Sequence, residues 1–355
     1  MRHWWKFLAL GLLLYASIMA LRAPLAPALV HVSPDRLAVG DAVLTIKGYN
    51  THFTDGYGVY LINGGDRFCA SQVKAIRNDL IEARFTVPEG VRENLSSLVV
   101  HEPGVGRLGL PNAIFHDRTG QGSATEGCEA AATTATLGSG EFNFPNRSIL
   151  YESIRNLNFH VPMWFTMMAI MAVSLYHSIR TLSTNDLRND RGAAVAVHVG
   201  LLFCAMGLAT GSVWARATWG AWWTNDVKLN GAAVTALIYL AYLVLRGSVT
   251  EAHRRAKLAA VYNIFAFMLL VLFLLVVPRL TQIDSLHPGS GGNPAFNQYD
   301  LDDNLRTVFY PAVAGWILLS IWLYRLRYRM LNVQDAMEEH EHAITTAAVS
   351  NHMTT

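Results

Sequence analysis

Charged side chains are scarce in this sequence, because Asp, Glu, Lys and Arg make up only 15% of its 355 residues. Soluble domains usually carry about 25%. The scarcity is concentrated in a set of apolar runs, whereas the segments between them have ordinary polarity. The formal net charge is +2, so the global balance gives no support for nucleic acid as a partner. This composition predicts a multi-span membrane protein with one polar domain outside the membrane.

Cysteine is also rare, and the three cysteines are Cys69, Cys128 and Cys204. No pair has the C-x-x-C spacing expected for a zinc or thioredoxin-like site. Cys204 lies inside an apolar run and is interpreted as a small packing residue. Cys69 and Cys128 both fall in the large polar segment, and the sequence leaves open whether they form a disulfide or stay as thiols.

Six apolar runs of about 18–22 residues are long enough to cross a membrane. The first follows Arg2 and is followed by Pro24, with no clean small-x-small cleavage site, so residues 1–23 are interpreted as an uncleaved anchor. Backbone polar groups have no partners in lipid, so every run is expected to be a helix. The runs cover residues 4–22, 161–179, 192–213, 231–247, 258–278 and 308–325.

Basic residues in three segments predict the orientation of these spans. By the positive-inside rule the segments lie in the cytoplasm. A count of spans from a cytoplasmic N-terminus agrees at every loop, so residues 23–160, 214–230 and 279–307 are predicted on the outer face of a bacterial inner membrane, with both termini cytoplasmic. The basic residues are Arg180, Arg188 and Arg191, then Arg246, Arg254, Arg255 and Lys257, and finally Arg325, Arg327 and Arg329.

Residues 24–118 are predicted to form a small periplasmic β-sandwich. Short alternating β-rich runs are separated by glycine and proline turns, and the stretch HVSPDRLAVGDAVLTIKGYNTHF at 31–53 resembles the opening of IPT/TIG-type immunoglobulin-like modules. The histidines scattered over this domain are interpreted as packed or solvated. The fold class is therefore an α-helical polytopic membrane protein with six transmembrane helices and a small extracytoplasmic all-β immunoglobulin-like domain.

The remaining segments are assigned by composition and periodicity. Residues 119–145 are small, polar and rich in Gly, Ala and Thr, which is typical of a linker. Residues 146–158 place their apolar side chains on one helical face, which predicts a short amphipathic helix on the outer membrane surface. Residues 146–330 form the predicted five-span membrane domain. Residues 331–355 are predicted to be a cytoplasmic tail that is disordered from Asp335.

Three features converge on the predicted outer face. His160 in FHVPMWF begins the second span, and His287 lies in DSLHPGSGG between the last two spans. Between them, the segment TGSVWARATWGAWWTNDVKLN at 210–230 also carries the charged residues Arg216, Asp226 and Lys228. An interfacial belt explains two tryptophans better than four, and single interfacial histidines are common. The four are Trp214, Trp219, Trp222 and Trp223.

This residue set suits heme better than it suits bond-making chemistry. Heme is a flat apolar disc with two carboxylates and an iron that accepts imidazole on each face. Indoles offer a flat surface for the disc, two neutral histidines supply axial bonds, and a cation such as Arg216 or Lys228 pairs with a carboxylate. No nucleophile and no glycine-rich phosphate loop are recognised, so the chain is predicted to be a carrier and not an enzyme.

The segment TWGAWWTNDVKLN resembles the tryptophan-rich WWD motif of heme-handling membrane proteins. With FHVP before it and LHPGS after it, the order of motifs over residues 146–330 resembles the CcmC family, also called heme exporter protein C. The family pattern is close to WGxWWxWDxRLT, and this chain departs from it at Asn225, Lys228 and Asn230. The first departure removes an aromatic contact, and lysine grips a carboxylate less firmly than arginine. The outer β-domain is a further departure.

The resemblance implies a function and partners. It makes His160 and His287 the axial ligands of heme b, with Asp226 and the four tryptophans as the heme platform. It implies that heme is held at the periplasmic face and loaded onto the periplasmic heme chaperone CcmE, near the ABC-transporter subunits CcmA and CcmB and the small protein CcmD.

Two alternatives stay open. One is a heme-delivering part of a CcsA-type cytochrome c synthetase, which would give the membrane histidines His177 and His198 a role in heme uptake. Packed or interfacial histidines are the preferred interpretation of that pair. The other alternative is a structural or sensory membrane protein with a β-domain, which predicts that the purified chain carries no heme.

Overall fold

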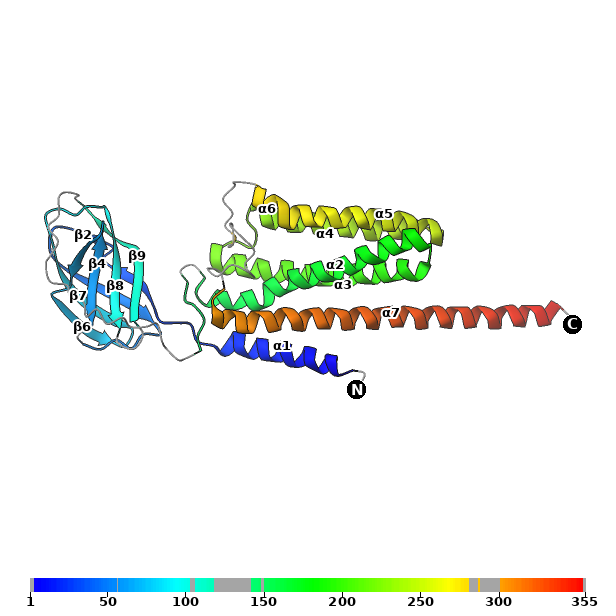
Figure 1. The fold of residues 1–355 in the computed structure, drawn as a ribbon, viewed down its shortest axis with the longest axis horizontal. Helices are drawn as coiled ribbons and strands as arrows, with labels where there is room; N and C mark the ends of the chain where they lie inside the picture. Colours follow the sequence, from blue (N-terminus) through cyan, green and yellow to red (C-terminus); the bar gives the residue numbers. More distant parts are fainter. Residues whose placement is uncertain are drawn as a thin grey trace. The chain divides into compact units, whose positions relative to one another are not determined.

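A computed structural model describes the chain in residues 3–55, 57–102, 106–117, 142–147, 150–280, 287 and 301–353, and the chain divides into two compact units. The helical unit comprises Met1–Arg22 and Ser153–Thr355, and the β unit comprises Ala23–Glu152. Figure 1 shows the helices and the strands of these units in separate colours along the chain. The predicted linker at 119–145 lies largely outside the described residues.

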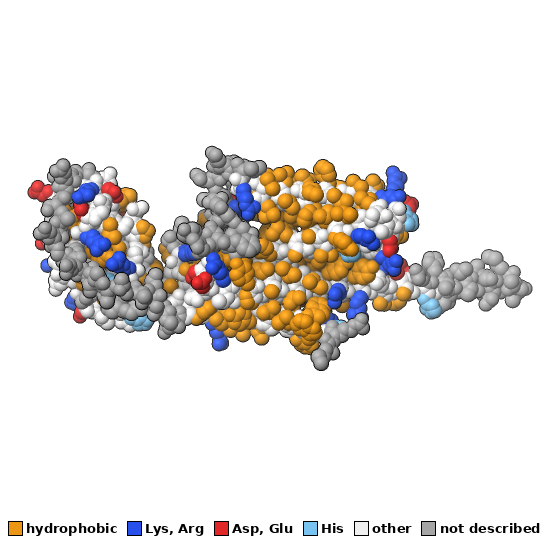
Figure 2. Space-filling view, in the orientation of Figure 1, with side chains coloured by type: hydrophobic (Ala, Val, Ile, Leu, Met, Phe, Trp, Pro, Cys, Tyr) orange, Lys and Arg blue, Asp and Glu red, His pale blue; other side chains and the backbone are white. Residues whose placement is uncertain are grey.

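Six helices of the helical unit are long and apolar enough to cross a membrane. On the face shown in Figure 2, hydrophobic side chains cover the middle of this unit and Lys and Arg side chains lie nearer its ends. This distribution confirms the prediction of a polytopic membrane protein. The helices are α1 (Trp4–Arg22), α2 (Leu157–Thr184), α3 (Leu187–Trp219), α4 (Val227–Ser248), α5 (Ala252–Val271), which continues through η2 (Leu272–Val276) and α6 (Val277–Leu280), and α7 (Asp303–Met353).

Two sequence predictions about this unit are corrected. The tail was expected to be disordered from Asp335, but α7 continues to Met353. Residues 331–353 contain no glycine or proline and many good helix formers, so nothing in them ends the helix. The amphipathic helix expected at 146–158 is a short 3-10 helix, η1 (Tyr151–Asn156), which leads directly into α2.

The first helix packs along α7 as an anchor would. A Cβ on Gly315 of α7 would lie 3.0 Å from the side chain of Leu13, so the missing side chain allows α1 to approach closely. At one end of this contact, the Lys6 ammonium lies 4.9 Å from the centre of the Trp322 ring. The Arg325 guanidinium lies 5.3 Å from the centre of the Trp5 ring, so cation–π contacts bind both helices together.

The contact between α2 and α3 is made by large α2 side chains seated on α3 glycines. A Cβ added to any of these glycines would come within 3.0 Å of an α2 side chain. Small residues permit this close approach, which matters in lipid because hydrophobic burial gives no driving force between helices. The pairs are Gly192 with His177, Gly200 with Met171, Gly207 with Trp164 and Gly211 with His160.

Polar contacts also join the helices in the interior. The Asn263 amide on α5 donates to the hydroxyls of Ser174 and Ser178 on α2, at 2.5 Å and 2.7 Å, and all three residues are fully buried. Near the arginine-rich end, Arg246 of α4 donates to Asp190 of α3 through two nitrogens, the second at 2.9 Å. Both charged side chains are largely buried, so this pair fixes α4 against α3.

The β unit contains two sheets whose buried residues form one hydrophobic core. One sheet has the order β1-β3-β7-β6 and the other has the order β2-β9-β8-β4-β5. Every second residue of β7 is buried, namely Ile81, Ala83, Phe85 and Val87, because successive side chains of a strand point to opposite faces of the sheet. The strands are β1 (Ala28–Ser33), β2 (Arg36–Leu37), β3 (Gly40–Tyr49), β4 (Gly58–Asn63), β5 (Asp66–Cys69), β6 (Gln72–Arg77), β7 (Leu80–Val87), β8 (Leu95–Glu102) and β9 (Gly106–His116).

The cysteine and histidine interpretations have clear outcomes where the structure describes them. Cys69 is disulfide-bonded, and its proposed partner Cys128 lies outside the described residues. Cys204 is free and buried, which confirms its interpretation as a packing residue. His116 is buried in the β unit, where its Nε2 lies 2.7 Å from the Ser96 hydroxyl, so it is a packed histidine.

We expect Arg246→Leu to destabilise the helical unit strongly. The substitution leaves the buried Asp190 carboxylate without its partner, and breaking a buried pair in this way costs about 3–5 kcal/mol. Thermal unfolding of the detergent-solubilised chain measures the loss. The matched control is Arg188→Leu, which removes an exposed ion pair with Asp186. Equal melting temperatures for the two variants would show that the buried pair does not hold α4.

We expect the β unit to lose stability as the pH falls below about 6.5, the ordinary histidine pKa. Burial lowers the pKa of His116, and the nearby Asp117 charge opposes this only in part. As the pH falls, His116 therefore takes up a proton in the unfolded chain before it does so in the folded chain. The ionisation of His116 leaves the free energy of unfolding unchanged above that pH and lowers it below that pH. Hydrogen exchange in β8 and β9, corrected for intrinsic rates, measures the effect. The His116→Gln variant should show a flatter pH dependence, and an unchanged dependence would contradict this account.

Candidate functional site

His160 lies in the first turns of α2 and is buried against α3. Its Nδ1 lies 3.0 Å from the Gly207 carbonyl oxygen and 3.2 Å from the Thr210 hydroxyl oxygen. A carbonyl oxygen can only accept, so Nδ1 carries the proton and donates it. The second ring nitrogen, Nε2, then presents a lone pair, which is the form of imidazole that binds a metal.

The structure brings the two predicted histidine ligands together. The centres of the His160 and His287 rings lie 6.2 Å apart, with 44° between the ring planes. Metal–imidazole bonds are about 2 Å long, so two rings on opposite sides of one metal have centres about 6 Å apart. The observed separation therefore fits two axial ligands of a single heme iron. The residues on either side of His287 lie outside the described residues.

Aromatic rings surround this histidine pair. The Trp214 and Trp164 rings stand nearly perpendicular to the His160 ring, at 83° and 78°, with centres 5.7 Å and 6.2 Å away. The Trp219 ring lies 6.4 Å from His287. Sequence reasoning identified Trp214 and Trp219 and missed Trp164, although Trp164 follows His160 by one helical turn and so shares its face.

Trp222 and Trp223 have a different environment from the other two tryptophans of the segment. Helix α3 ends at Trp219, and Gly220 takes a left-handed φ of 76° that turns the chain away. The Trp222 and Trp223 side chains that follow are 60% and 43% exposed. They stand in the turn before α4, and a heme contact by these two side chains stays a prediction.

The charged residues of the segment hold the ends of helices. The Asp226 side chain is buried and accepts a hydrogen bond of 2.8 Å from the Lys228 backbone N–H, which makes it the N-cap of α4. The Arg216 guanidinium donates to the Gly220 carbonyl at the end of α3. These contacts fix the turn that carries the tryptophans. A direct contact of Arg216, Asp226 or Lys228 with heme stays a prediction.

The short helix η1 ties the start of α2 to α3. The Trp214 indole N–H donates to the Ser153 hydroxyl at 3.0 Å. The Asn156 amide donates to the Thr210 carbonyl oxygen at 2.9 Å. Both bonds hold the Trp214 and Thr210 turns of α3 beside His160. Sequence reasoning missed Ser153 and Asn156, since polar residues before a span carry no specific signal.

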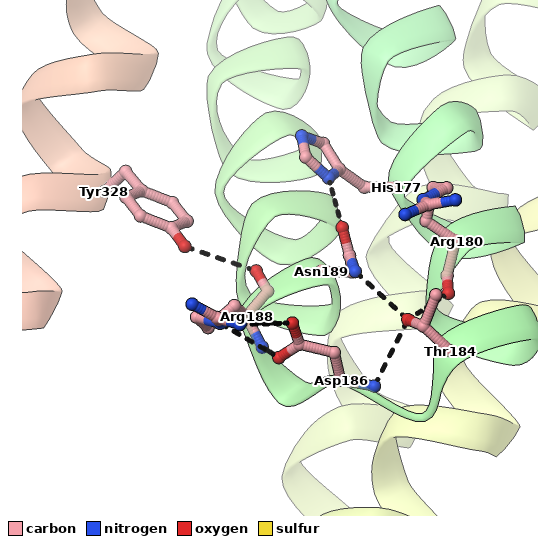
Figure 3. A network of polar contacts seen from close by, with 7 residues as sticks. All are labelled: His177, Arg180, Thr184, Asp186, Arg188, Asn189 and Tyr328. Atoms are coloured by element: carbon pink, nitrogen blue, oxygen red, sulfur yellow. Dashed lines mark hydrogen bonds and ion pairs between the residues drawn. The ribbon is translucent and has the colours of Figure 1, made fainter.

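His177 and His198 each form hydrogen bonds within the helical unit. Figure 3 shows the His177 ring directed at Asn189 on α3, with Thr184 and Asp186 completing the turn between α2 and α3. His177 Nδ1 lies 3.3 Å from the Asn189 amide oxygen, and its Nε2 lies 3.0 Å from the Tyr324 hydroxyl. His198 bonds the Ala194 carbonyl of its own helix. Both His177 nitrogens are therefore engaged.

A comparison with known protein families finds a match to the part of the chain that contains His160 and the tryptophan segment. Residues 132–283 match the family model described as Cytochrome C assembly protein. This range contains His160 and the whole tryptophan segment, and it ends before His287. The resemblance to heme exporter protein C that the motifs indicated is thereby confirmed together with the relatives that follow.

Curated relatives carry two names. Heme exporter protein C of Bradyrhizobium diazoefficiens is 30% identical over 138 residues, which cover 38% of this chain and 52% of the relative. Heme exporter protein C of Paracoccus denitrificans is 26% identical over 200 residues, 56% of this chain and 82% of the relative. Cytochrome c biogenesis protein CcsA of Prochlorococcus marinus is 34% identical over 100 residues, 27% of this chain and 31% of the relative. The chain thus spans about half the length of the Bradyrhizobium relative.

We expect Asp226→Ala to destabilise α4 by about 1 kcal/mol, the usual cost of removing an N-cap side chain. Asp226→Asn should cost much less, because an amide oxygen can accept the same bond from the Lys228 N–H. Denaturant titration of the solubilised chain compares the two variants. If Asn is as damaging as Ala, the carboxylate charge matters more than the cap, and the capping account of Asp226 is wrong.

Proposed function

We propose that this chain, which resembles heme exporter protein C, binds heme b at the outer face of a bacterial inner membrane and presents it to the periplasmic heme chaperone CcmE during cytochrome c maturation. The observation that carries the proposal is the pairing of His160 with His287, whose ring centres are 6.2 Å apart. Heme is the cargo here, and its iron supplies two axial positions for imidazole.

The residues of the chain hold this cargo without performing chemistry on it. His160 and His287 supply nitrogen ligands, and the neighbouring Trp214 and Trp219 rings exclude water from the histidines and offer apolar surface to the porphyrin. Trp222 and Trp223 extend that surface at the exposed turn. The proposed role is therefore that of a carrier and loading factor, and not that of an enzyme.

The outer location of the site follows from the charges at the opposite end of the helices. Within the helical unit, most of the arginines lie at one end of the helices. They are Arg180, Arg188 and Arg191 near the turn between α2 and α3, Arg246, Arg254 and Arg255 near the turn between α4 and α5, and Arg325, Arg327 and Arg329 after Trp322 in α7. The positive-inside rule assigns that end to the cytoplasm. His160, at the other end of α2, then lies at the periplasmic face. The β unit, joined to the chain between α1 and η1, is accordingly proposed to be a periplasmic immunoglobulin-like domain.

The proposed partners come from the family. Relatives named heme exporter protein C support assembly with the transporter subunits CcmA and CcmB and with the small protein CcmD. The exposed turn with Trp222 and Trp223 is the proposed side from which CcmE receives heme, since it is the part of the tryptophan segment that is open at the surface.

A second candidate function is heme delivery within a CcsA-type cytochrome c synthetase. The similarity to the Prochlorococcus marinus protein of that name favours it. A synthetase of that kind would use additional membrane histidines for heme uptake, and the engagement of both His177 nitrogens argues against such a use. Formation of covalent cytochrome c by this chain without CcmE would favour the second candidate.

We expect the chain purified in detergent to show the absorption spectrum of a low-spin, bis-histidine heme in both redox states. His160→Ala and His287→Ala should each lose or shift that spectrum, because either change removes one axial ligand. His198→Ala is the matched control, since this histidine is exposed and bonded within its own helix, and it should keep the wild-type spectrum.

A colourless wild-type chain in heme-sufficient cells would contradict heme binding and favour a structural or sensory role. Heme transfer to CcmE is a separate measurement. Cells that express the His160→Ala variant should accumulate much less heme-loaded CcmE than cells that express the His198→Ala control. Equal loading in both strains would remove CcmE presentation from the proposal while leaving heme binding intact.

A further inference from the structure

We infer that Thr210 and Gly211 of α3 are positioning residues that fix the His160 ring in one tautomer and one orientation for heme. This inference rests on the proposed function and concerns the two residues that open the tryptophan segment, to which the sequence motifs assign no role. It follows from two independent features of the same helix turn: the hydrogen bonds that His160 Nδ1 donates, and the space left for the His160 ring.

The hydroxyl oxygen of Thr210 accepts a hydrogen bond from His160 Nδ1. A hydroxyl has one proton to donate, and the Thr210 hydroxyl donates it to the Met206 carbonyl at 2.8 Å, or to the Gly207 carbonyl at 3.2 Å. Its oxygen therefore turns a lone pair toward His160 Nδ1, 3.2 Å away. The Gly207 carbonyl is a second acceptor for the same nitrogen. With only acceptors around Nδ1, the Nε2-protonated tautomer is disfavoured.

The space for the ring is provided by Gly211. A Cβ at this position would lie 2.6 Å from His160 Cε1 and 3.1 Å from its Nδ1. Real Cβ atoms do not approach other atoms so closely, so the ring would have to move. The Trp164 and Trp214 rings stand on its flanks at nearly right angles. A displaced imidazole therefore moves relative to His287, and the spacing that suits two axial ligands is lost.

The contacts of Thr210 and Gly211 with His160 would affect the heme iron through the imidazole ligand. A hydrogen bond from the outer N–H of a coordinated imidazole fixes the ring and raises the basicity of the ligating nitrogen, and losing such support typically weakens metal binding about 10–100-fold. A more basic imidazole stabilises ferric over ferrous heme. Loss of a hydrogen-bond acceptor for the Nδ1–H of His160 should therefore make the reduction potential of the bound heme more positive.

Four variants of the full-length chain in detergent test the inference. Gly211→Ala displaces the ring. Thr210→Val removes the hydroxyl acceptor at nearly constant volume and leaves the Gly207 carbonyl as the acceptor for Nδ1, and Thr210→Ser retains both acceptors. Gly192→Ala is the matched control, because its Cβ would lie 2.9 Å from His177 at the other end of the same pair of helices. The readouts are the affinity for added hemin, the low-spin absorption spectrum and the midpoint potential.

The expected result is a loss of hemin affinity of about tenfold or more in Gly211→Ala, with a high-spin contribution to the spectrum, and wild-type heme binding in Gly192→Ala. Thr210→Val should shift the midpoint potential to a more positive value, and Thr210→Ser should restore the wild-type value. A general packing defect would not give Thr210→Val and Thr210→Ser different midpoint potentials. Comparison of these two variants therefore tests the inference even if Gly211→Ala fails to fold.

Two negative outcomes are distinguishable. If the wild-type chain binds heme through His160 and His287 but all four variants match it in affinity, spectrum and potential, the positioning role is overturned and the proposed function stands. If the wild-type chain binds no hemin, the proposed function fails and the positioning role fails with it.

Discussion

The close contact between α2 and α3 is the constraint on which the rest of the helical unit depends. Lipid is as apolar as the side chains of a membrane helix, so the two helices associate through packing and interhelical hydrogen bonds. Four glycines of α3 receive large side chains of α2, from Gly192 at one end to Gly211 at the other. The same interface thereby sets the position of His160, since the ring of this residue is the last of the four side chains.

The two ends of this interface hold histidines with different uses. At the arginine-rich end, both ring nitrogens of His177 form hydrogen bonds, one with Asn189 and one with Tyr324. His177 is therefore a structural polar residue that links α2, α3 and α7. At the opposite end, His160 Nδ1 donates a hydrogen bond to the Gly207 carbonyl of α3, and the His160 ring lies beside the ring of His287. Burial of an imidazole in a helix interface is therefore compatible with either role, and the partners of the second nitrogen decide between them.

The charged residues Arg216 and Asp226, close to the candidate site, form hydrogen bonds with backbone groups at the ends of helices. Asp226 begins α4 and Arg216 closes α3, so the turn between them is fixed at both ends. A carboxylate at the start of a helix also faces the positive end of its dipole, which adds to the stability of the cap. Retaining the hydrogen-bond acceptor at Asp226 and the donor at Arg216 would thus preserve the shape of the tryptophan turn even without a contact to the cargo.

The sequence by itself determined the features that depend on composition and order along the chain. The six spans follow from apolar runs, because lipid leaves the backbone no partner other than its own helix. The motif order identified His160, His287 and the tryptophan segment, since axial ligands and aromatic surface need particular residue types. The extent of α7 was missed because a polar composition was read as disorder, although the segment contains no residue that ends a helix.

Only the tertiary structure decided which of these residues meet and in what chemical form. The 6.2 Å separation of the His160 and His287 rings depends on how α2 packs, and no spacing in the sequence encodes it. Trp164 is part of the site because it shares a face of α2 with His160, and Thr210 and Gly211 are part of it because they contact His160 across the interface between α2 and α3. The roles of Asp226 and His177 were likewise settled by hydrogen bonds to nearby or distant backbone and side chains. Composition and periodicity specify which face of a helix is buried, but the partner of each atom is set by three-dimensional packing.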